Sequence, residues 1–299
     1  MAGVAGLGTL GGLHGMALAQ TDLKRLTILH TNDTHSRIDP FPANDPGYPG
    51  MGGYARRAAL INQFRQSDPE LLLLDAGDFF QGTPYFNKYG GETELVLMSH
   101  LGYDAATLGN HEFDNGLEGL LHVLPHARFP FVCSNYDFSD TVLRDKTLPY
   151  LVLERNGVSV GIYGLGISLD GLVARHHFGN TVVLDPIEVA REMESTLKRK
   201  GCDLILCISH LGFRYEHDRV SDYILAGHTR ETDIIIGGHT HRRLDPAEVV
   251  RNESGREVTI GQAGSAGVFL GRMVVYFEPD TGEKLVESNT TNISKNQVV

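Results

Sequence analysis

Five short segments of this 299-residue chain end in side-chain types that bind divalent metal ions. They carry Asp, His and Asn, and each follows an apolar run that is typical of a β-strand. Five strand ends can converge on one point of a folded sheet, where two metal ions would activate water and stabilise the charge on an ester. The pattern favours a metal-dependent phosphoesterase. The segments are residues 30–35, 75–78, 109–114, 209–210 and 237–241.

The first two segments carry three carboxylates and a histidine that could share a metal. Asp33 and His35 stand two residues apart, a spacing that points both side chains the same way in extended backbone. Asp78 follows Gly77, where glycine permits a sharp turn, and we predict Asp78 as the carboxylate that bridges two ions. Asp75 has two open roles, as part of the site or as a residue that caps or orients the turn.

The third segment combines a neutral oxygen ligand with a candidate acid. Asn110 can offer its amide oxygen to a metal, and it stands beside His111. A carboxylate at Asp114 would fix the tautomer of His111 and favour the imidazolium, which could donate a proton to a phosphoryl oxygen or to the leaving group. We therefore predict His111 and Asp114 as catalytic residues, and Asn110 and His111 as residues that contact the substrate.

Three histidines follow the last two strand-like runs. His210 ends one run, and His239 and His241 end the other, where Gly237 and Gly238 allow a close backbone approach. A single histidine at a strand end is commonly structural, but three at two strand ends indicate metal ligands. Carboxylate, imidazole and amide ligands without a thiolate suit two divalent ions of Zn, Mn, Fe or Co.

A run of one arginine and two histidines at residues 175–177 lies outside these segments. It is either an exposed surface run or an element of a substrate-binding loop. The sequence leaves both interpretations open.

The composition limits the partners of the chain. Apolar residues make up 41% of the sequence, enough to bury a sizeable core. A net charge of −11 argues against a nucleic-acid polymer as partner, whereas two bound cations would reverse the local sign for a small phosphate ester. The cysteines lack CxxC spacing, which argues against a disulfide framework or a zinc-thiolate site. We expect them in the core; they are Cys133, Cys202 and Cys207.

Strand-like and helical patterns alternate along most of the chain, which predicts a layered α/β fold with one mixed sheet or two sheets flanked by helices. A hairpin is expected around the Asn156-Gly157 turn. The other expected strands are 26–29, 71–74, 105–108, 129–134, 204–208, 234–236, 257–260 and 267–277, and the helices are 54–65, 92–101, 117–126 and 186–200.

The two ends differ in composition from the middle. We predict residues 1–22 as a partial export signal or a disordered N-terminus, 23–280 as the catalytic domain and 281–299 as a polar tail. Residues 17–19, Ala-Leu-Ala, fit a signal-peptidase site, although no basic residue precedes them. We expect an exported protein, periplasmic or otherwise extracytoplasmic, with no transmembrane span.

Residues 26–38 and 103–114 resemble the two sequence signatures of the 5′-nucleotidase family, within the calcineurin-like metallophosphoesterases. The resemblance covers about residues 25–280, with the segments in order. It implies a four-layer sandwich of two mixed β-sheets flanked by helices. It also implies hydrolysis of phosphate monoesters of 5′-nucleotides or similar small molecules, by attack of a water held by two metals.

The resemblance assigns a ligand set to each ion and a role to the histidine pair. His111 and Asp114 match the catalytic dyad of the family, and Asp78 is shared between the ions. The first ion would be held by Asp33, His35, Asp78 and His241. The second would be held by Asp78, Asn110, His210 and His239.

Two departures from the family pattern keep other functions open. Some relatives have Gln where this chain has His241, so the preferred metal could differ. Full-length members carry a second domain that binds the base, and we expect either a separate polypeptide of that kind or a substrate that is not a nucleotide. Alternatives are a UDP-sugar, cyclic-nucleotide or thiosulfonate substrate, or a non-catalytic nucleotide- or partner-binding protein. The pairing of His111 with Asp114 argues against the last, because binding alone needs no acid.

Overall fold

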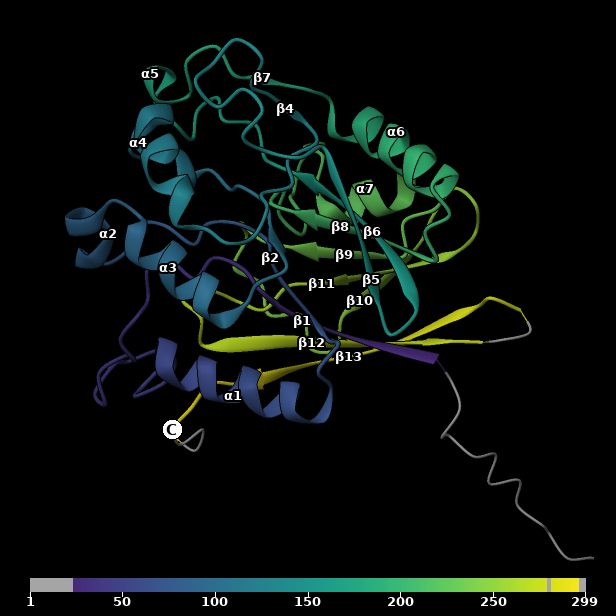
Figure 1. Ribbon diagram of the computed structural model, residues 1–299, viewed down its shortest axis with the longest axis horizontal. Coiled ribbons are helices and arrows are strands. Elements are labelled where there is room, and N and C mark those ends of the chain that lie inside the picture. The colour runs from purple at the N-terminus through teal and green to yellow at the C-terminus, as the bar shows by residue number, and fades with distance from the viewer. Residues whose placement is uncertain (1–23, 279–280, 296–299) are drawn as a thin grey trace, which may run out of the picture.

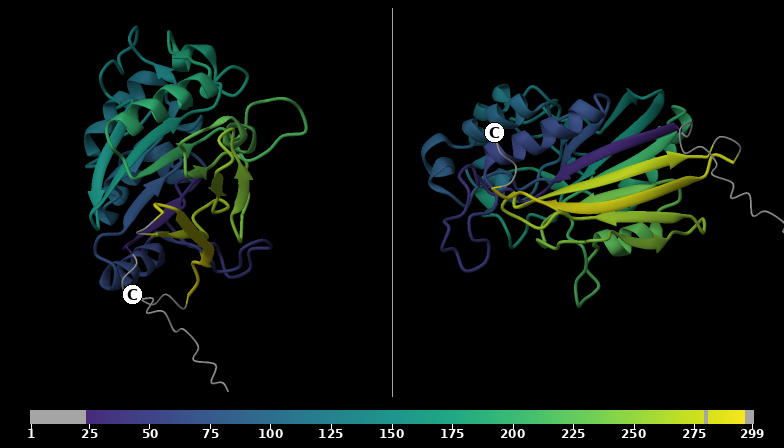
Figure 2. Two further views of the ribbon diagram at one scale, coloured as in Figure 1. Left: turned by 90° about the vertical axis from the view of Figure 1, so that its right-hand side faces the viewer. Right: turned by 90° about the horizontal axis from the view of Figure 1, so that it is seen from below.

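The computed structural model describes residues 24–278 and 281–295 (Figure 1). Two β-sheets pack face to face, and helices cover the outer face of each sheet (Figures 1 and 2). This arrangement confirms the four-layer α/β sandwich that the family resemblance implies. Residues 1–22, predicted as an export signal, lie outside the described residues.

The first sheet has five strands in the order β13-β12-β1-β2-β3. The neighbours β1, β2 and β3 run parallel, so their carboxyl ends meet at one edge, whereas β12 and β13 are antiparallel to their neighbours. The bounds are β1 Lys24–Thr31, β2 Leu72–Asp75, β3 Ala105–Ala106, β12 Phe269–Phe277 and β13 Lys284–Asn292.

The second sheet has six strands in the order β10-β11-β9-β8-β6-β5. Its central strands β6, β8, β9 and β11 are parallel, and the outer strands are antiparallel to them. The bounds are β5 Tyr150–Arg155, β6 Val158–Leu165, β8 Leu204–Ser209, β9 Ile234–Gly237, β10 Glu248–Arg251 and β11 Glu257–Gly261. A separate pair joins β4 Tyr136–Asp137 to β7 Val182–Val183.

The side-chain alternation of the strands divides the core into layers. In β2, Leu72 and Leu74 point between the two sheets, while Leu73 points to the helices that cover the first sheet. These helices are α1 Tyr54–Ser67, α3 Glu92–Leu101 and α4 Gly116–Val123. The second sheet is covered by α6 Pro186–Arg199 and α7 Asp222–His228. Short helices lie at α2 Pro84–Tyr89, η1 His111–Phe113, η2 Leu124–His126 and α5 Arg175–Phe178.

The structure corrects two expectations from the sequence. Residues 129–134 form no named strand and make only the isolated bridges Ala106–Phe131 and Val132–Leu148. Residues 284–292, expected as part of a polar tail, form β13 at the edge of the first sheet. Its side chains alternate between half-buried and exposed positions, so a polar sequence can occupy an edge strand with one face on the protein.

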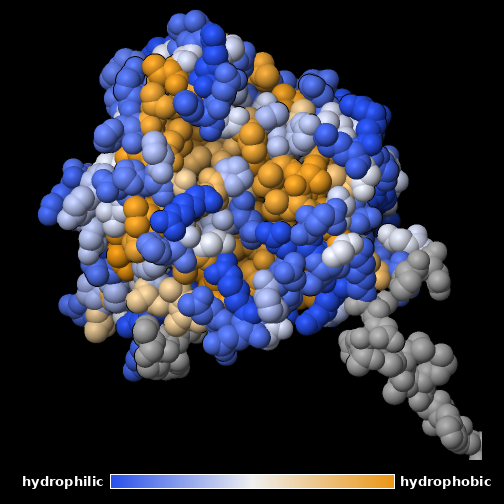
Figure 3. Space-filling model, viewed as in Figure 1, coloured by the Kyte–Doolittle hydropathy of each residue, from blue (hydrophilic) through white to orange (hydrophobic). Residues whose placement is uncertain are grey.

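The described surface is mostly hydrophilic on the face of Figure 3, with apolar residues gathered in patches between charged ones. The three cysteines are free and buried, as expected for core residues. No helix among the described residues is long and apolar enough to cross a membrane.

Candidate metal centre

Backbone hydrogen bonds join the loops that follow β1 and β2. The amide of Asp33 donates to the carbonyl of Gly77 at 2.9 Å, and the amide of His35 donates to the carbonyl of Asp78 at 3.1 Å. The second sheet is tied to the same point, because the amide of His239 donates to both carboxylate oxygens of Asp33 at 3.1 and 3.0 Å. These hydrogen bonds therefore hold the loops of both sheets in fixed positions relative to one another.

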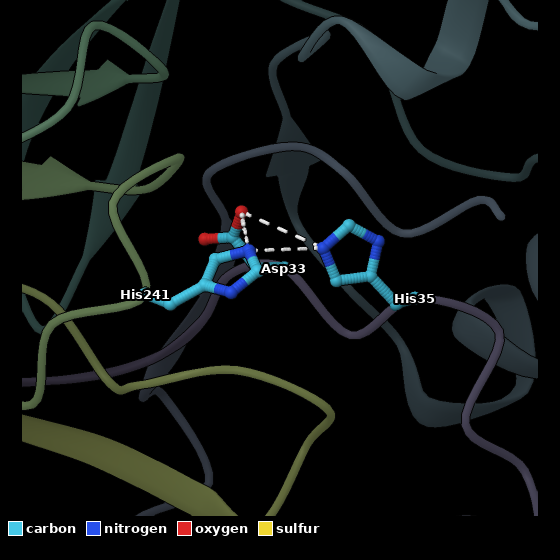
Figure 4. A group of neighbouring side chains, drawn as sticks. All are labelled: Asp33, His35 and His241. Carbon is cyan, nitrogen blue, oxygen red and sulfur yellow. Dashed lines mark hydrogen bonds and ion pairs between the residues drawn. The ribbon is translucent and has the colours of Figure 1, made fainter. Parts of the chain in front are cut away.

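Asp33, His35 and His241 form the first cluster of metal-ligand side chains, and they point toward one another (Figure 4). Nε2 of His241 lies 3.2 Å from Oδ1 of Asp33 and 3.1 Å from Nε2 of His35. Asp33 is fully buried, whereas His241 is exposed at the mouth of the site. Two sheets thus contribute to one set of ligands.

Asp78, His210 and His239 form a second cluster. Nδ1 of His210 donates to the carbonyl of Ala76 at 2.6 Å, which fixes the tautomer and turns Nε2 toward the site. Nε2 is buried and lies 3.0 Å from Oδ2 of Asp78, but it makes no well-aligned hydrogen bond to any of the described residues. Asn110 joins this cluster, with Oδ1 3.0 Å from Nδ1 of His239.

Asp78 lies between the two clusters. Its carboxylate groups with His210 and His239 on one side, and with His35 and His111 on the other, with ligand atoms within 4.8 Å of one another in each group. Oδ1 also accepts the backbone N–H of His111 at 2.8 Å. This position is the one that a carboxylate shared between two ions would occupy.

The backbone is bent into the left-handed region at most of the candidate ligands. Ten described residues other than glycine have positive φ, and five of them belong to the two clusters. A positive φ is strained for residues other than glycine and persists where the surrounding structure holds the backbone in place. At these positions the side chains point toward a common point. The five are Asp33 (φ 48°), His35 (47°), Asp78 (56°), His239 (67°) and His241 (54°).

His111 and Asp114 form a close pair beside the clusters. Nδ1 of His111 lies 2.8 Å from Oδ2 of Asp114. This hydrogen bond raises the pKa of His111 to about 9, against the opposing effect of partial burial. The ring of His111 lies 5.3 Å from that of His35, centroid to centroid, so a protonated imidazole stands at the edge of the first cluster.

The histidines of the second cluster have opposite electrostatic environments. Burial alone would lower the pKa of His210, but Asp78 outweighs it and raises the pKa to about 10. Burial lowers the pKa of His239 to about 4, which leaves this ring neutral with a free lone pair. The neighbouring histidines His210, His111 and His35 hold the pKa of Asp78 below its ordinary value in spite of burial. Asp78 is therefore held in its anionic form.

Two roles were left open for Asp75, and its contacts are those of a residue that orients the turn. Its Oδ2 accepts the hydroxyl of Thr31 at 2.5 Å, and its Oδ1 accepts the amide of Gly77 at 2.9 Å. It belongs to neither ligand cluster. Gly77 has φ +87°, and a Cβ at this position would lie 2.6 Å from the amide nitrogen of Gly109, so the turn requires glycine.

Glu112 is a residue that the sequence analysis did not single out. It is buried, and its Oε2 accepts the amides of Asp78 and Gly109 at 2.9 and 2.6 Å, while Oε1 accepts the amide of Phe80 at 3.2 Å. Burial raises the pKa of Glu112 to about 8. One side chain thus fastens the β2 loop to the segment that carries Asn110. Its only sequence signal is its place beside His111.

The sequence analysis also did not identify Gln262 and Asn32 as residues that hold the loops of the site. Gln262 donates to the carbonyl of Gly238 at 2.6 Å and accepts the hydroxyl of Thr240 at 3.1 Å, which holds the loop between His239 and His241. Asn32 ties the β1 loop to residues 263–264, through contacts of 2.8 and 2.7 Å. Gln262 has no local sequence pattern that distinguishes it from other polar residues.

The residues present fit two divalent cations. The donors are carboxylate and amide oxygens and imidazole nitrogens, and the clusters meet at a shared carboxylate. The buried Nε2 of His210 has no hydrogen-bond partner in the part of the chain that the structure describes, as expected of a ligand nitrogen that faces a cation site. All seven predicted ligands lie together here, with His111 and Asp114 beside them.

A two-sheet sandwich with an Asp-, His- and Asn-rich centre at the strand ends defines a class of metal-dependent hydrolases. Residues 26–243 match the calcineurin-like phosphoesterase family. The chain belongs to this family, which confirms the resemblance seen in the sequence.

Several relatives are similar over most of this chain. It is 33% identical over 294 residues to a snake venom 5′-nucleotidase from Gloydius brevicauda, covering 92% of this chain and 50% of the relative. It is 34% identical over 270 residues to a 5′-nucleotidase from Homo sapiens, covering 85% of this chain and 46% of the relative. The chain thus spans about half the length of these curated relatives.

Two solved structures are also similar to this chain over most of its length. A 5′-nucleotidase precursor from Thermus thermophilus superposes with a TM-score of 0.83 at 35% identity, covering 91% of this chain and 55% of that one. The calcineurin-like phosphoesterase YfkN from Bacillus subtilis superposes with a TM-score of 0.76 at 28% identity, covering 93% of both chains.

Proposed function

We propose that this protein hydrolyses phosphate monoesters of 5′-nucleotides or similar small molecules at a centre of two divalent ions. The observation that carries the proposal is the position of Asp78 between two clusters of metal-ligand side chains. The likeness to 5′-nucleotidases over most of this chain supports a nucleotide as substrate. A polymer of nucleic acid is not proposed, since the chain carries a net charge of −11.

Each ion has a proposed set of ligands. Two such ions, when bound, would lower the pKa of a coordinated water and neutralise charge on the phosphoryl oxygens. Zn, Mn, Fe and Co all suit the donors. Asp33, His35, Asp78 and His241 would hold the first ion, and Asp78, Asn110, His210 and His239 would hold the second.

Residues next to the proposed ligands would supply a proton, contact the substrate and hold the ligand loops in place. His111, held by Asp114, carries a proton that it can donate to a phosphoryl oxygen or to the leaving-group oxygen. Asn110 and His111 would contact the substrate, because Asn110 lies beside His239 of the second cluster and His111 groups with His35 and Asp78. Glu112 and Gln262 keep the ligand loops in place through hydrogen bonds to backbone groups.

Localisation and partners belong to the same proposal. We propose export from the cytoplasm, on the small apolar residues that precede Gln20. The partner that we propose is the small phosphate-ester substrate, and the likeness to 5′-nucleotidases supports a nucleotide.

The test is phosphate release by the purified chain loaded with Mn or Zn. AMP, UDP-glucose, cyclic AMP and a chromogenic diester would be compared, each with an EDTA control. EDTA-sensitive release from AMP supports the proposal. Release from another ester alone would replace AMP as substrate, and the absence of release from all four with two ions bound would contradict the phosphoesterase function.

A further inference from the structure

Six buried polar atoms without a hydrogen-bond partner gather around one small cavity next to the loop that carries His35. They are six of the fourteen buried side-chain atoms that lack a partner among the described residues. A folded protein contains few such atoms, so six at one place indicate a group that binds there. The atoms are Oγ of Ser36, Nε of Arg37, Nε and Nη1 of Arg57, and both carboxylate oxygens of Glu94.

The cavity lies between helices α1 and α3 and the loop that follows β1. Arg57 comes from α1 and Glu94 from α3, and the two residues are only 5% and 6% exposed. Thr34 and Ser36 line the cavity from the loop, one on either side of His35. The cavity therefore adjoins the segment that carries two proposed ligands of the first ion.

Arg57 and Glu94 bring opposite charges to the cavity without meeting. Neither oxygen of Glu94 has a hydrogen-bond partner among the described residues, so no direct hydrogen bond joins it to Arg57. Burial raises the pKa of Glu94, and the nearby hydroxyl of Ser36 lowers it in part, although the two make no well-aligned hydrogen bond. A group that accepts from Arg57 and donates to Glu94 would satisfy both residues.

The size and the polar groups of the cavity fit one water molecule. The volume is about 10 Å³, and a single water needs roughly 10–15 Å³. Water is both a donor and an acceptor, as the guanidinium of Arg57 and the carboxylate of Glu94 together demand. A monatomic cation would be repelled by Arg57 and an anion by Glu94, so an ion of either sign fits less well.

Arg57 also contacts the segment that holds Asp33. A Cβ at Gly267 would lie 2.4 Å from Nη1 of Arg57, so the guanidinium packs directly against this glycine. The amide of the preceding residue, Ala266, donates to the carbonyl of Asp33 at 2.7 Å. The guanidinium thus lies one residue away from the amide that holds Asp33.

The loop beside the cavity has a strained backbone. His35 and Ser36 are consecutive residues with φ of 47° and 52°, a conformation that persists only where the surrounding structure holds it. Their amides donate to the carbonyls of Asp78 and Phe79 at 3.1 and 2.9 Å, whereas the hydroxyl of Ser36 borders the cavity. The loop is therefore held by the β2 loop and, at Ser36, by the group that fills the cavity.

We propose that the cavity binds one ordered water molecule, and that Arg57 and Glu94 act through this water as positioning residues for Asp33 and His35. The water accepts an N–H of Arg57 and donates to Glu94, which leaves it a further hydrogen bond for the hydroxyl of Ser36. This proposal rests on the proposed function, because it takes Asp33 and His35 as ligands of the first ion. Changes at Glu94 should therefore affect the first ion and not the second.

A crystal structure of the metal-free protein tests the water directly. We expect a peak of ordered density at about 2.7–3.2 Å from both Glu94 and Arg57, the range of a hydrogen bond. Crystals soaked in rubidium bromide distinguish water from an ion, because rubidium and bromide scatter anomalously and water does not. A rubidium or bromide peak in the cavity, or no density there, would overturn the proposal.

Metal titration by calorimetry tests the positioning role. In Glu94→Leu the water loses its acceptor, and we expect the affinity for the first ion to fall by about 10–100-fold, the usual effect of a residue that supports a metal ligand. The affinity for the second ion should stay that of the wild type. Glu94→Gln keeps an oxygen acceptor and should lie between Glu94→Leu and the wild type. Glu92→Leu, at an exposed glutamate of the same helix, is the matched control and should change neither affinity.

A double-mutant cycle identifies the ion that responds. His241→Ala already removes a proposed ligand of the first ion, so Glu94→Leu should add little further loss of metal in that background. If Glu94→Leu does not fold, Glu94→Gln replaces it in the cycle, with a smaller loss that is again confined to the first ion. An equal loss of both ions would overturn the positioning role, because it would show a general effect on the fold.

The two experiments separate this proposal from the proposed function. A wild type that binds fewer than two ions contradicts the two-metal centre and with it the positioning role, while the crystal structure still decides whether the cavity binds water. Two ions in the wild type, with an affinity for the first that both Glu94 variants leave unchanged, would overturn the positioning role and leave the proposed function standing.

Discussion

Nε2 of His210 lies 3.0 Å from Oδ2 of Asp78, with both side chains buried between the loops of the two sheets. Nδ1 of the same histidine is committed to the carbonyl of Ala76. The pair therefore joins the first sheet to the second at the point where the two ligand clusters meet. Its geometry makes Asp78 the residue on which both proposed ions depend.

Replacing Asp78 tests this dependence. Asp78→Ala should lose at least one of two bound ions, because the carboxylate lies within reach of ligands from both clusters. Metal content per chain after gel filtration is the measurement. Asp140→Ala, at an exposed aspartate, serves as the control. Two ions retained at full occupancy in Asp78→Ala would contradict the bridging role.

His111 should matter for turnover and not for metal binding. His111→Ala is expected to lower kcat by roughly 10²–10⁴-fold, the usual contribution of a positioned proton donor, while metal content stays that of the wild type. His122→Ala, on the exposed side of α4, should leave both unchanged. Wild-type turnover in His111→Ala would remove this residue from the mechanism.

Glu112 should act through the loops that it holds. In Glu112→Gln, an amide N–H would face one of the three backbone N–H donors now bound by the carboxylate. We expect the free energy of unfolding to fall by about 1–3 kcal/mol and metal affinity to fall by about 10–100-fold. Denaturant unfolding and metal titration measure the two effects. Glu118→Gln, exposed on α4, should change neither, and an equal response of both variants would refute the positioning role.

Asp222 should make stability depend on pH. It is buried, its Oδ1 accepts the hydroxyl of Ser209, and its Oδ2 has no partner among the described residues. Burial raises its pKa from 3.8 to about 8. Between these values the unfolded chain has released the proton that the folded chain keeps, so rising pH lowers the free energy of unfolding.

Asp222→Asn removes this titration, keeps the acceptor for Ser209 and adds a donor at the unpartnered position. The variant should match the wild type near pH 4 and exceed it by about 1 kcal/mol or more at pH 8. Chemical unfolding of both proteins in EDTA across this range is the measurement. A difference that does not grow with pH would show that Asp222 is ionised in the folded protein.

The segments that carry the proposed ligands could be predicted because each follows a strand-like run, and the proposed ligand set of each ion comes from the family resemblance. His111 and Asp114 could be predicted as a pair because they resemble a His–Asp dyad and match that of the family, and the two side chains lie 2.8 Å apart. The positive φ at Asp33 or His241 has no sequence signal, because it depends on the neighbouring loops that hold the backbone in this conformation.

The features that the sequence did not predict have a common physical origin, because each of them depends on tertiary contacts. Glu112 and Gln262 bond to backbone groups of distant loops, and no local periodicity records such partners. Residues 129–134 have a strand-like composition but find only isolated bridge partners. Strand β13 is polar because one of its faces stays open, so composition alone predicted a tail there.

The most direct test of the two-metal centre is a titration of Mn into EDTA-treated protein with phosphate release from AMP as the signal. We predict no release before metal is added and a maximum at two ions per chain, with Asp78→Ala unable to reach it. Full activity without metal, or a maximum at one ion per chain with no gain from a second, would contradict the two-metal centre.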